Sequence, residues 1–389
     1  MSLLDLMASL RAAKPEWELQ LISSAEGSLV TNARALGVQS LVVSFPQSLA
    51  RIGDAGLSIT PNKRPLQVFV LRALCKTSPA IATYVRSLRR AINSLAPDLI
   101  HTNGFKMHIL GVWANSRNVP LVWNIRDYVR PRKIMSRLLW MHTRWCSAAI
   151  TNSRSVADDV SAACGDKLEV FAVHNAIDLQ RFSPCGTRLD LDLLSHLETA
   201  GDGVVRIGLL GTMARWKGHE VFLRAISRLP KELDFRAYII GGPIYLTERS
   251  QYSLEELRRL AALLGIADRT GFTGYVDEPA NAIRALDIVV HASTQPEPFG
   301  RSIAESMACG RATVVSEGGG ASEIVSPEID VLTHISGDAF SLASAIQRLI
   351  VNRPLRQQLG ERARSAAERR FHRGRLAEQV GSIYHSLAP

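Results

Sequence analysis

The most constraining feature of this chain is the alternation of short apolar runs with longer amphipathic stretches. The short runs are rich in β-branched residues and have the length of buried strands, and the stretches between them have a helical period. This alternation predicts parallel sheets with covering helices, an α/β fold. The expected strands are residues 19–23, 40–44, 98–101, 121–124, 148–151, 169–172, 205–210, 235–240, 271–274, 287–292, 312–315 and 331–333.

The length of the chain predicts more than one domain, because 389 residues are unlikely to share a single core. A stretch at 183–203 that contains Pro, Gly and Asp interrupts the alternation, and we interpret it as a linker. We therefore predict a first domain at 1–184, a second at 185–370 and a final helix at 371–389. Parallel sheets of this kind bind ligands at the carboxyl ends of their strands, so we expect the site in a cleft between the domains.

The cysteine pattern and the hydropathy of the sequence limit the cellular compartments in which we expect this protein. The five cysteines are scattered and form no Cys-x-x-Cys or Cys/His cluster, which favours a reduced cytoplasm and argues against a structural metal. No stretch approaches the roughly 18 apolar residues of a membrane span. The N-terminus lacks the basic region of a signal peptide. We expect a cytoplasmic protein that can attach to the inner face of a membrane.

The net charge of +10 is concentrated in the first half of the chain. Residues 1–184 contain 22 basic and 12 acidic residues, and the remainder contains 24 of each. Such a basic domain fits an anionic membrane surface, a lipid-diphosphate acceptor, an acidic glycan or a nucleic acid, and the alternative is a solvated basic surface. We expect no nucleic-acid partner, because no recognition helix, aromatic strand motif or zinc module accompanies the charge.

The segment from Glu297 to Glu305 follows a predicted strand and opens a predicted helix. A glycine at this junction, Gly300, lets the backbone approach a ligand closely, and the free N–H groups of the first helical turn form an anion site. The two carboxylates can accept hydrogen bonds from hydroxyl groups at different heights of one cavity. This pattern predicts a nucleoside diphosphate sugar as ligand. A capped helix with two solvated glutamates is the alternative.

Three further segments follow predicted strands of the second domain. Arg215 and Lys217 occupy a loop before a helix, where they can neutralise a diphosphate leaving group. Basic residues at a helix N-terminus oppose its dipole, which favours a functional role over a solvated loop. Residues 271–276 are a weaker signal, a strand leading into a loop that could contact a base through backbone groups and the Tyr275 ring. The glycine loop at 317–323 could bind sugar or phosphate, but a tight turn explains it equally well.

Taken in order, these motifs resemble the retaining glycosyltransferases of family 4, which have the GT-B fold. The likeness covers nearly the whole chain, although it is looser in the first half. It implies two Rossmann-like domains that face each other across a cleft, with the final helix crossing back to the first. The matching motifs are Gly-x4-Trp-Lys-Gly at 211–218, Ile-Gly-Gly at 240–242, Phe-Thr-Gly-Tyr-Val at 272–276, Glu-x7-Glu at 297–305 and Gly-Gly-x-x-Glu-Ile-Val at 319–325.

The resemblance also implies roles for individual residues. Glu297 would contact the donor sugar, Glu305 the nucleotide ribose and Lys217 the diphosphate. We expect Glu297, Lys217 and Arg215 to be catalytic, and we expect no metal or other cofactor. The expected donor-binding residues are Gly211, Thr212, Tyr275, Val276, Pro298, Phe299, Gly300, Arg301 and Glu305, with backbone N–H groups at 299–301 binding the diphosphate.

The chain departs from the family pattern at several positions. Thr212 stands where many members have arginine, so Arg215 would supply that charge. Arg126-Asp127 replaces a frequent His-Asp pair, whereas His101 matches a frequent histidine; these three residues are the acceptor-side candidates. The usual first strand and glycine-rich loop are absent before the helix that begins at Ser2. Either the start site is assigned late, or the first domain lacks a central strand.

We therefore expect sugar transfer from a nucleotide diphosphate sugar to a glycan or lipid-linked acceptor, with retention of anomeric configuration. One alternative is a nucleotide-sugar epimerase of the same architecture, and another is a catalytically silent nucleotide-sugar-binding scaffold. Asp190-Leu-Asp192 resembles the metal motif of another glycosyltransferase class. We interpret it as solvated, because it lies in the expected linker.

Overall fold

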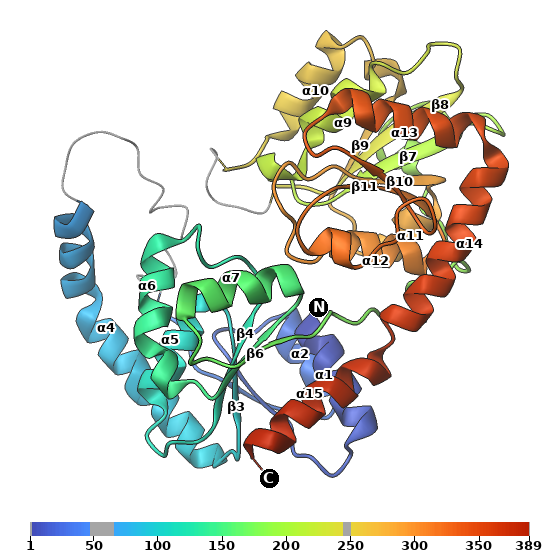
Figure 1. The fold of residues 1–389 in the computed structure, drawn as a ribbon. Helices are drawn as coiled ribbons and strands as arrows, with labels where there is room; N and C mark the ends of the chain where they lie inside the picture. Colours follow the sequence, from blue (N-terminus) through green and yellow to red (C-terminus); the bar gives the residue numbers. More distant parts are fainter. Residues whose placement is uncertain (1, 47–65, 244–249, 389) are drawn as a thin grey trace. The chain divides into compact units, whose positions relative to one another are not determined.

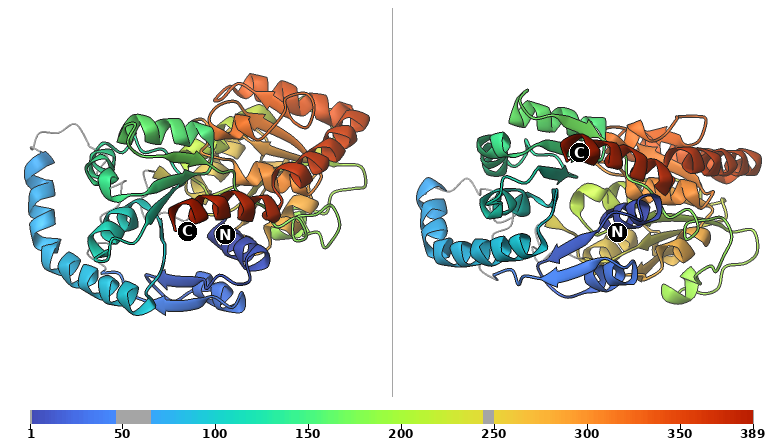
Figure 2. Two further views of the ribbon diagram at one scale, coloured as in Figure 1. Left: turned by 60° about the horizontal axis from the view of Figure 1, so that its bottom comes forward. Right: turned by 90° about the horizontal axis from the view of Figure 1, so that it is seen from below.

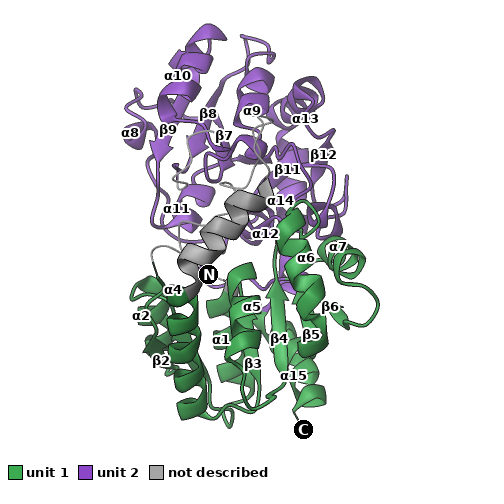
Figure 3. Ribbon diagram, turned by 90° about the vertical axis from the view of Figure 1, so that its left-hand side faces the viewer, with its two compact units in different colours: residues 1–174, 373–389 green, residues 175–372 purple. Residues whose placement is uncertain are grey.

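The computed structural model of the chain describes residues 2–46, 66–243 and 250–388. The chain forms two compact units: unit 1 is residues 1–174 with 373–389, and unit 2 is residues 175–372 (Figure 3). Parallel sheets of four and six strands confirm the α/β fold predicted from the alternation. The domain limits expected from the sequence stay a prediction, and the first of them, at 184, lies beyond the division of the units after His174.

The main sheet of unit 1 has the strand order β3-β4-β5-β6, and all its pairs are parallel. Each of its helices α5, α6 and α7 connects two neighbouring strands (Figure 1). Because such crossovers are right-handed, the three helices cover the same face of the sheet. The bounds are β3 Ile100–Asn103, α5 Phe105–Ala114, β4 Leu121–Ile125, α6 Lys133–His142, β5 Ala148–Thr151, α7 Arg154–Cys164 and β6 Val170–Ala172.

The beginning of unit 1 forms a smaller parallel sheet of β1 (Gln20–Ser23) and β2 (Gln39–Val42). Helix α1 (Ser2–Ala13) precedes it, as the sequence predicts, and α2 (Ser28–Ala35) joins the two strands. Helix α4 (Leu66–Leu95) then leads to β3. In the described part of the chain β1 and β2 pair only with each other, so unit 1 contains two separate sheets.

The last helix, α15 (Arg373–Leu387), packs along α1 (Figure 2). An ion pair of 2.7 Å joins Arg373 to Asp5, and the rings of Trp17 and Tyr384 stack with centroids 6.1 Å apart. These contacts connect the C-terminal end of the chain to the first helix of unit 1.

Unit 2 has one parallel sheet of order β12-β11-β10-β7-β8-β9. Helices α9, α10 and α13 share one apolar core with the sheet, and α8, α11, α12 and α14 share a second. The strands are β7 Val205–Leu210, β8 Phe235–Ile240, β9 Thr270–Gly274, β10 Ile288–His291, β11 Ala312–Ser316 and β12 Leu332–His334. The helices are α8 Leu191–Leu194, α9 His219–Ile226, α10 Leu254–Leu263, α11 Pro279–Arg284, α12 Arg301–Ala308, α13 Ala339–Val351 and α14 Arg353–Arg370.

Side-chain caps fix where several of these helices begin. Ser253 and Glu256 form a capping box at the start of α10, and Asp338 accepts backbone hydrogen bonds at the start of α13. These caps satisfy N–H groups that have no partner within the helix. The helix starts therefore follow from local sequence.

The interpretation of residues 183–203 as a linker, with Asp192 solvated, is wrong. Asp192 is 2% exposed, and its carboxylate accepts hydrogen bonds from Arg236 at 2.8 Å, Arg206 at 3.2 Å and the Tyr238 hydroxyl. Burial alone would raise the pKa of this carboxyl, but the hydrogen bonds outweigh it and lower the pKa to about 2. The charges of two arginines on β7 and β8 thus hold α8 against the sheet.

Candidate functional site

The motifs predicted to bind a ligand lie together at the carboxyl ends of the unit 2 strands. Between the lysine loop and the segment after β10, the backbone N–H of Thr294 donates to the carbonyl of Trp216 at 2.7 Å. The glycine loop after β11 joins the same segment, because the N–H of Gly320 donates to the carbonyl of Glu297 at 2.7 Å. Three loops that are distant in sequence therefore form one connected surface.

Gly218 allows the lysine loop to approach β10 this closely. Its backbone is left-handed, with φ of 76° and ψ of 27°, and a Cβ atom there would lie 1.8 Å from the carbonyl oxygen of Ala292. Any other residue would push the two segments apart. The glycine therefore sets the position of Lys217, which immediately precedes it.

The side chains of Lys217 and Glu297 form an ion pair at this junction. The Lys217 Nζ lies 2.7 Å from Oε2 of Glu297, and the same oxygen accepts a hydrogen bond from the Ser293 hydroxyl at 2.9 Å. The side chain of Glu297 is 10% exposed, whereas that of Lys217 is 20% exposed. The pair thus keeps the carboxylate buried and the ammonium accessible.

His291, which the sequence analysis did not select, completes the environment of Glu297. Its Nε2 lies 3.2 Å from Glu297 Oε2, and its Nδ1 lies 3.1 Å from the Ser316 hydroxyl. A carboxylate only accepts hydrogen bonds, so Nε2 carries the proton and, in the neutral ring, Nδ1 accepts from Ser316. The signal in the sequence was a histidine inside an otherwise apolar strand, because β10 reads Ile-Val-Val-His.

These contacts set the charge of Glu297. Burial alone would raise the pKa of its carboxyl, but the hydrogen bond from His291 and the positive charge of Lys217 outweigh burial and lower the pKa to about 2. Glu297 is therefore ionised at neutral pH. The site holds a fixed negative charge beside an accessible positive one.

The start of α12 lies directly after Glu297. Gly300 precedes the helix with a left-handed φ of 87°, and Phe299 is 2% exposed, its ring edge-on to Phe371 at 6.1 Å. The Arg301 guanidinium donates to Glu305 at 2.7 Å. The Phe299 side chain therefore anchors the turn in the core. Only the backbone of Phe299 can contact a ligand.

The remaining candidates of unit 2 differ in their surroundings. Arg215 is directed at α10, because it pairs with Glu256 at 3.0 Å and lies 4.4 Å from the ring centroid of Tyr252. Tyr275 is 73% exposed, whereas Val276 packs against the second core of the unit. Their expected roles stay predictions. Gly211, Thr212 and Pro298 are half-buried in the same loops.

The acceptor-side candidates lie in unit 1. The His101 imidazole is hydrogen-bonded through Nδ1 to the Tyr384 hydroxyl of α15. Burial, with a smaller effect of the Arg126 charge, lowers the pKa of His101 to about 4. Asp127 pairs with Arg132 at 2.6 Å. His101 is therefore neutral at neutral pH, and its contact with α15 gives it a packing role as well.

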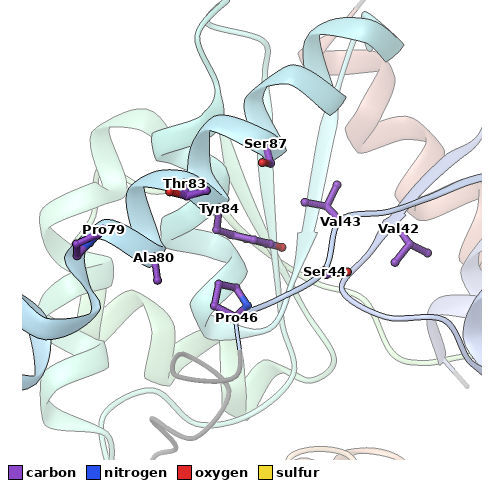
Figure 4. Close-up of a pocket in the computed structure, with 9 residues that line it drawn as sticks. All are labelled: Val42, Val43, Ser44, Pro46, Pro79, Ala80, Thr83, Tyr84 and Ser87. Carbon is purple, nitrogen blue, oxygen red and sulfur yellow. The ribbon is translucent and has the colours of Figure 1, made fainter.

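A cavity of about 650 Å³ lies between the end of β2 and the second half of α4 (Figure 4). None of the residues predicted from the sequence to form a site lines it. The lining residues are Val42, Val43, Ser44, Pro46, Pro79, Ala80, Thr83, Tyr84 and Ser87. The residues that line this cavity belong to unit 1, whereas Glu297 and its neighbours belong to unit 2.

No three His, Cys, Asp or Glu side chains within 2–46, 66–243 and 250–388 are grouped so that they could hold a metal ion. No helix in these ranges combines the length and the apolar composition that a membrane span requires.

Two family profiles match the chain in succession. The profile "Glycosyltransferase Family 4" matches residues 28–181, and "Glycosyl transferases group 1" matches residues 201–366. The chain belongs to glycosyltransferase family 4. This confirms the family that the motifs predicted, and both Lys217 and Glu297 lie within the second profile.

Similar proteins of this family include enzymes of lipopolysaccharide core biosynthesis. The mannosyltransferase LpsB of Rhizobium meliloti is 26% identical over 364 residues, which cover 90% of this chain and 98% of LpsB. An uncharacterised glycosyltransferase of Methanocaldococcus jannaschii is 30% identical over 187 residues, 47% of this chain and 45% of that protein. The mannosyltransferase LpcC of Rhizobium leguminosarum is 28% identical, and the alignment covers 51% of this chain and 58% of LpcC.

Solved structures of similar fold cover nearly the whole chain. The Anabaena HepE protein in complex with UDP-glucose matches with a TM-score of 0.76 at 21% identity, covering 98% of this chain and 96% of HepE. Sucrose-phosphate synthase from Thermosynechococcus elongatus matches with a TM-score of 0.74 at 20% identity, covering 98% and 91%. These likenesses show the fold and agree with the GT-B architecture that the motifs predicted.

Proposed function

We propose that this protein transfers a sugar from a nucleotide diphosphate sugar to a glycan or lipid-linked acceptor, with retention at the anomeric carbon. The observation that supports it most is the Lys217–Glu297 ion pair of 2.7 Å, which places an accessible cation beside a buried, ionised carboxylate. This pair lies at the carboxyl ends of parallel strands, where α/β proteins bind ligands.

In this proposal Lys217 stabilises the leaving diphosphate. Its ammonium group has three N–H donors, and one of them is directed at Glu297, so two can address phosphate oxygens. Negative charge grows on the diphosphate as the bond to the anomeric carbon breaks, so a fixed cation stabilises the transition state more than the ground state. The N–H groups at the start of α12 add to this effect.

Glu297 then binds the donor sugar rather than acting as a proton donor. A carboxylate that is held ionised accepts hydrogen bonds from sugar hydroxyl groups and orients the anomeric carbon. The bond from that carbon to the diphosphate breaks with its electron pair on the diphosphate. The acceptor oxygen bonds to the same face of the carbon, and the acceptor proton leaves with the diphosphate.

We propose that Glu305 binds the nucleotide ribose and that no divalent ion is needed, because Lys217 and α12 already offer positive potential to the diphosphate. Arg215 has a smaller role in this scheme, since it pairs with Glu256. The names of LpsB and LpcC favour a mannose or related hexose donor and a lipid-linked glycan acceptor. A lipid-linked acceptor also places the enzyme at a membrane surface.

A panel of nucleotide diphosphate sugars tests this function. The full chain is incubated with UDP-, GDP- and ADP-linked hexoses, including mannose donors, and release of the nucleoside diphosphate is measured with and without a chelator. We expect slow hydrolysis of one donor that the chelator leaves unchanged. The product formed with an acceptor should keep the anomeric configuration of the donor, measured by the anomeric proton coupling.

Two outcomes would assign another function. An epimerised donor formed without acceptor would identify a nucleotide-sugar epimerase of the same architecture. A donor-dependent rise in the unfolding temperature without hydrolysis or transfer would identify a silent binding scaffold.

A further inference from the structure

All the large apolar side chains that are strongly exposed in the described part of unit 1 belong to one surface. Trp113, Trp140, Met141 and Trp145 are 41%, 58%, 52% and 46% exposed. Trp140 and Met141 end α6, Trp145 lies in the 3₁₀ turn that continues it, and Trp113 lies near the end of the neighbouring α5 (Figures 1 and 3). Monomeric proteins rarely gather exposed apolar side chains in this way without an interaction partner.

The exposed face of α6 and of the turn after it combines cations with apolar side chains. Lys133, Arg137, Trp140 and Met141 of α6 and Arg144 of the 3₁₀ turn that follows it are all exposed, at successive spacings of four, three, one and three residues. Residues three and four apart lie on the same side of a helix, so these side chains form a single stripe. The other side of α6 faces inward, with Leu139 and His142 buried.

Contacts hold two of the three tryptophans, Trp113 and Trp145, in place on this surface. The Trp113 indole N–H donates to His142 Nε2 at 2.9 Å, and the His142 ring lies 5.5 Å from that of Trp145. The Arg144 guanidinium lies 3.8 Å from the Trp145 ring centroid. Arg89 of α4 donates to the Trp113 carbonyl at 2.7 Å. We call Trp113, Arg137, Trp140, Met141, Arg144 and Trp145 the tryptophan–arginine surface.

Acidic residues are scarce in the part of the sequence that forms the tryptophan–arginine surface. Between residues 55 and 157 the sequence contains 16 lysines and arginines but only two acidic residues, Asp98 and Asp127. Asp158 and Asp159 follow on α7, which packs against α6, and Asp159 accepts hydrogen bonds from the backbone N–H groups of Val129 and Arg130. Asp127 is paired with Arg132 at 2.6 Å. Helices α4, α5 and α6 contain no acidic residue at all. The positive charge around the tryptophans is therefore not neutralised by carboxylates of the same helices.

We propose that the tryptophan–arginine surface docks on an anionic lipid bilayer. Tryptophan prefers the interface between headgroups and acyl chains, and Lys and Arg around it are attracted to anionic headgroups. A short amphipathic helix that presents both kinds of side chain can lie in this interface. A soluble polyanion would bind the cations but would leave the apolar side chains in water. The proposal goes beyond sugar transfer, because docking requires no donor or acceptor.

Vesicle binding by the full chain tests this surface. The probes are vesicles of phosphatidylcholine alone and of phosphatidylcholine with phosphatidylglycerol, and the readout is co-sedimentation. We expect binding only to the anionic vesicles. The double variant R137Q/R144Q should weaken that binding on the order of tenfold or more, since each cation near the surface contributes about fivefold. The variant W140A/W145A should also weaken it and should reduce the blue shift of tryptophan emission on binding, with Trp113 left as the remaining tryptophan of the surface.

Matched variants of unit 2 separate this surface from general charge and hydrophobicity. R228Q/K231Q removes two exposed cations, and L263A/F340A truncates two exposed apolar side chains. Both should bind anionic vesicles as the parent does. Circular dichroism and the unfolding midpoint should match the parent for every variant compared.

Three results would overturn the proposal. The first is equal binding of the parent to neutral and anionic vesicles. The second is an equal loss of binding in R137Q/R144Q and R228Q/K231Q. The third is binding that depends on the two arginines but not on the two tryptophans, which would identify a site for a soluble polyanion. None of these readouts depends on sugar transfer, so failure of docking is distinguishable from failure of the proposed enzyme activity.

Discussion

The Lys217 ammonium lies 2.7 Å from Glu297 Oε2, and this contact joins two motifs that are 80 residues apart in the sequence. The lysine follows β7 and the glutamate follows β10, two neighbouring strands of the unit 2 sheet. Parallel pairing brings the carboxyl ends of both strands to the same edge of the sheet. The Lys217–Glu297 ion pair therefore forms because β7 and β10 are neighbours in the sheet.

Replacement of Lys217 tests the proposed stabilisation of the leaving group. We expect Lys217→Ala to lower kcat for transfer by about 10²-fold or more, because a charge aimed at the transition state is lost. Arg215→Gln is the matched control and should have a much smaller effect, since Arg215 is directed at Glu256. Steady-state transfer kinetics measure both variants. Equal losses would show that Lys217 has no special role.

His291 should act by positioning Glu297 and keeping it ionised. A hydrogen bond to a charged group contributes about 1.5–3 kcal/mol, so we expect His291→Phe to lower kcat roughly tenfold or more. Loss of the donor also raises the pKa of Glu297, so the acid limb of the pH–rate profile should move to higher pH. His291→Gln retains a donor and should recover part of the activity. An acid limb that stays in place would contradict this role.

We expect position 218 to require glycine for two reasons, because its backbone lies very close to Ala292 and because its φ is left-handed. We expect Gly218→Ala to cost about 2–3 kcal/mol of unfolding free energy and to lower transfer, because the added Cβ displaces Lys217. Gly265 is the control, since its φ is also positive, at 68°, but no atom lies within 4 Å of an added Cβ. Gly265→Ala should cost about 1 kcal/mol and leave the activity per folded molecule unchanged. Urea unfolding and transfer assays measure the two effects.

Asp192 should stabilise unit 2 without acting in transfer. We expect Asp192→Ala to destabilise it by about 3 kcal/mol, because Arg206 and Arg236 lose their shared carboxylate while partly buried. Its pKa of about 2 means that this stabilisation is complete above about pH 4 and is lost as the pH falls toward 2. Denaturant titration at neutral pH measures the loss. A variant as stable as the parent would refute the role.

Buried histidines should make the fold sensitive to mild acid. Burial lowers the pKa of His101 and His219 to about 4 and that of His108 to about 3, so all three are neutral in the folded protein at pH 7. The unfolded chain binds protons at these positions below about pH 6.5, so stability falls as the pH decreases from about 6.5 to 4. The slope is about 1.4 kcal/mol per pH unit for each histidine.

Denaturant unfolding at pH 7.5 and pH 5 measures this acid sensitivity. The variant His108→Asn keeps a polar partner for Thr102 but does not titrate, so its stability should change less between the two pH values than that of the parent. Identical stability of the parent at both pH values would contradict the prediction.

The sequence alone determined which segments form helices or strands and where the ligand-binding motifs begin and end. Strand and helix periods are local properties, so β7, β10, α12 and the helix at 66–95 could be located from them, and helix caps such as Ser253 fixed several starts. The ligand-binding motifs could be recognised because each lies within a single loop, so that the spacing of its residues is visible in the sequence. The resemblance to family 4 rested on the order of these loops along the chain.

The tertiary structure decided which side chains share an environment. Asp192 looked solvated within a polar stretch, and it is buried because Arg206, Arg236 and Tyr238 converge on it from other elements. His291 looked like part of an apolar strand until Ser316 and Glu297 were placed around it. Arg215 and Lys217 are two residues apart in one loop, yet one pairs with α10 and the other with Glu297. Burial and pairing depend on contacts between distant segments, which no local pattern encodes.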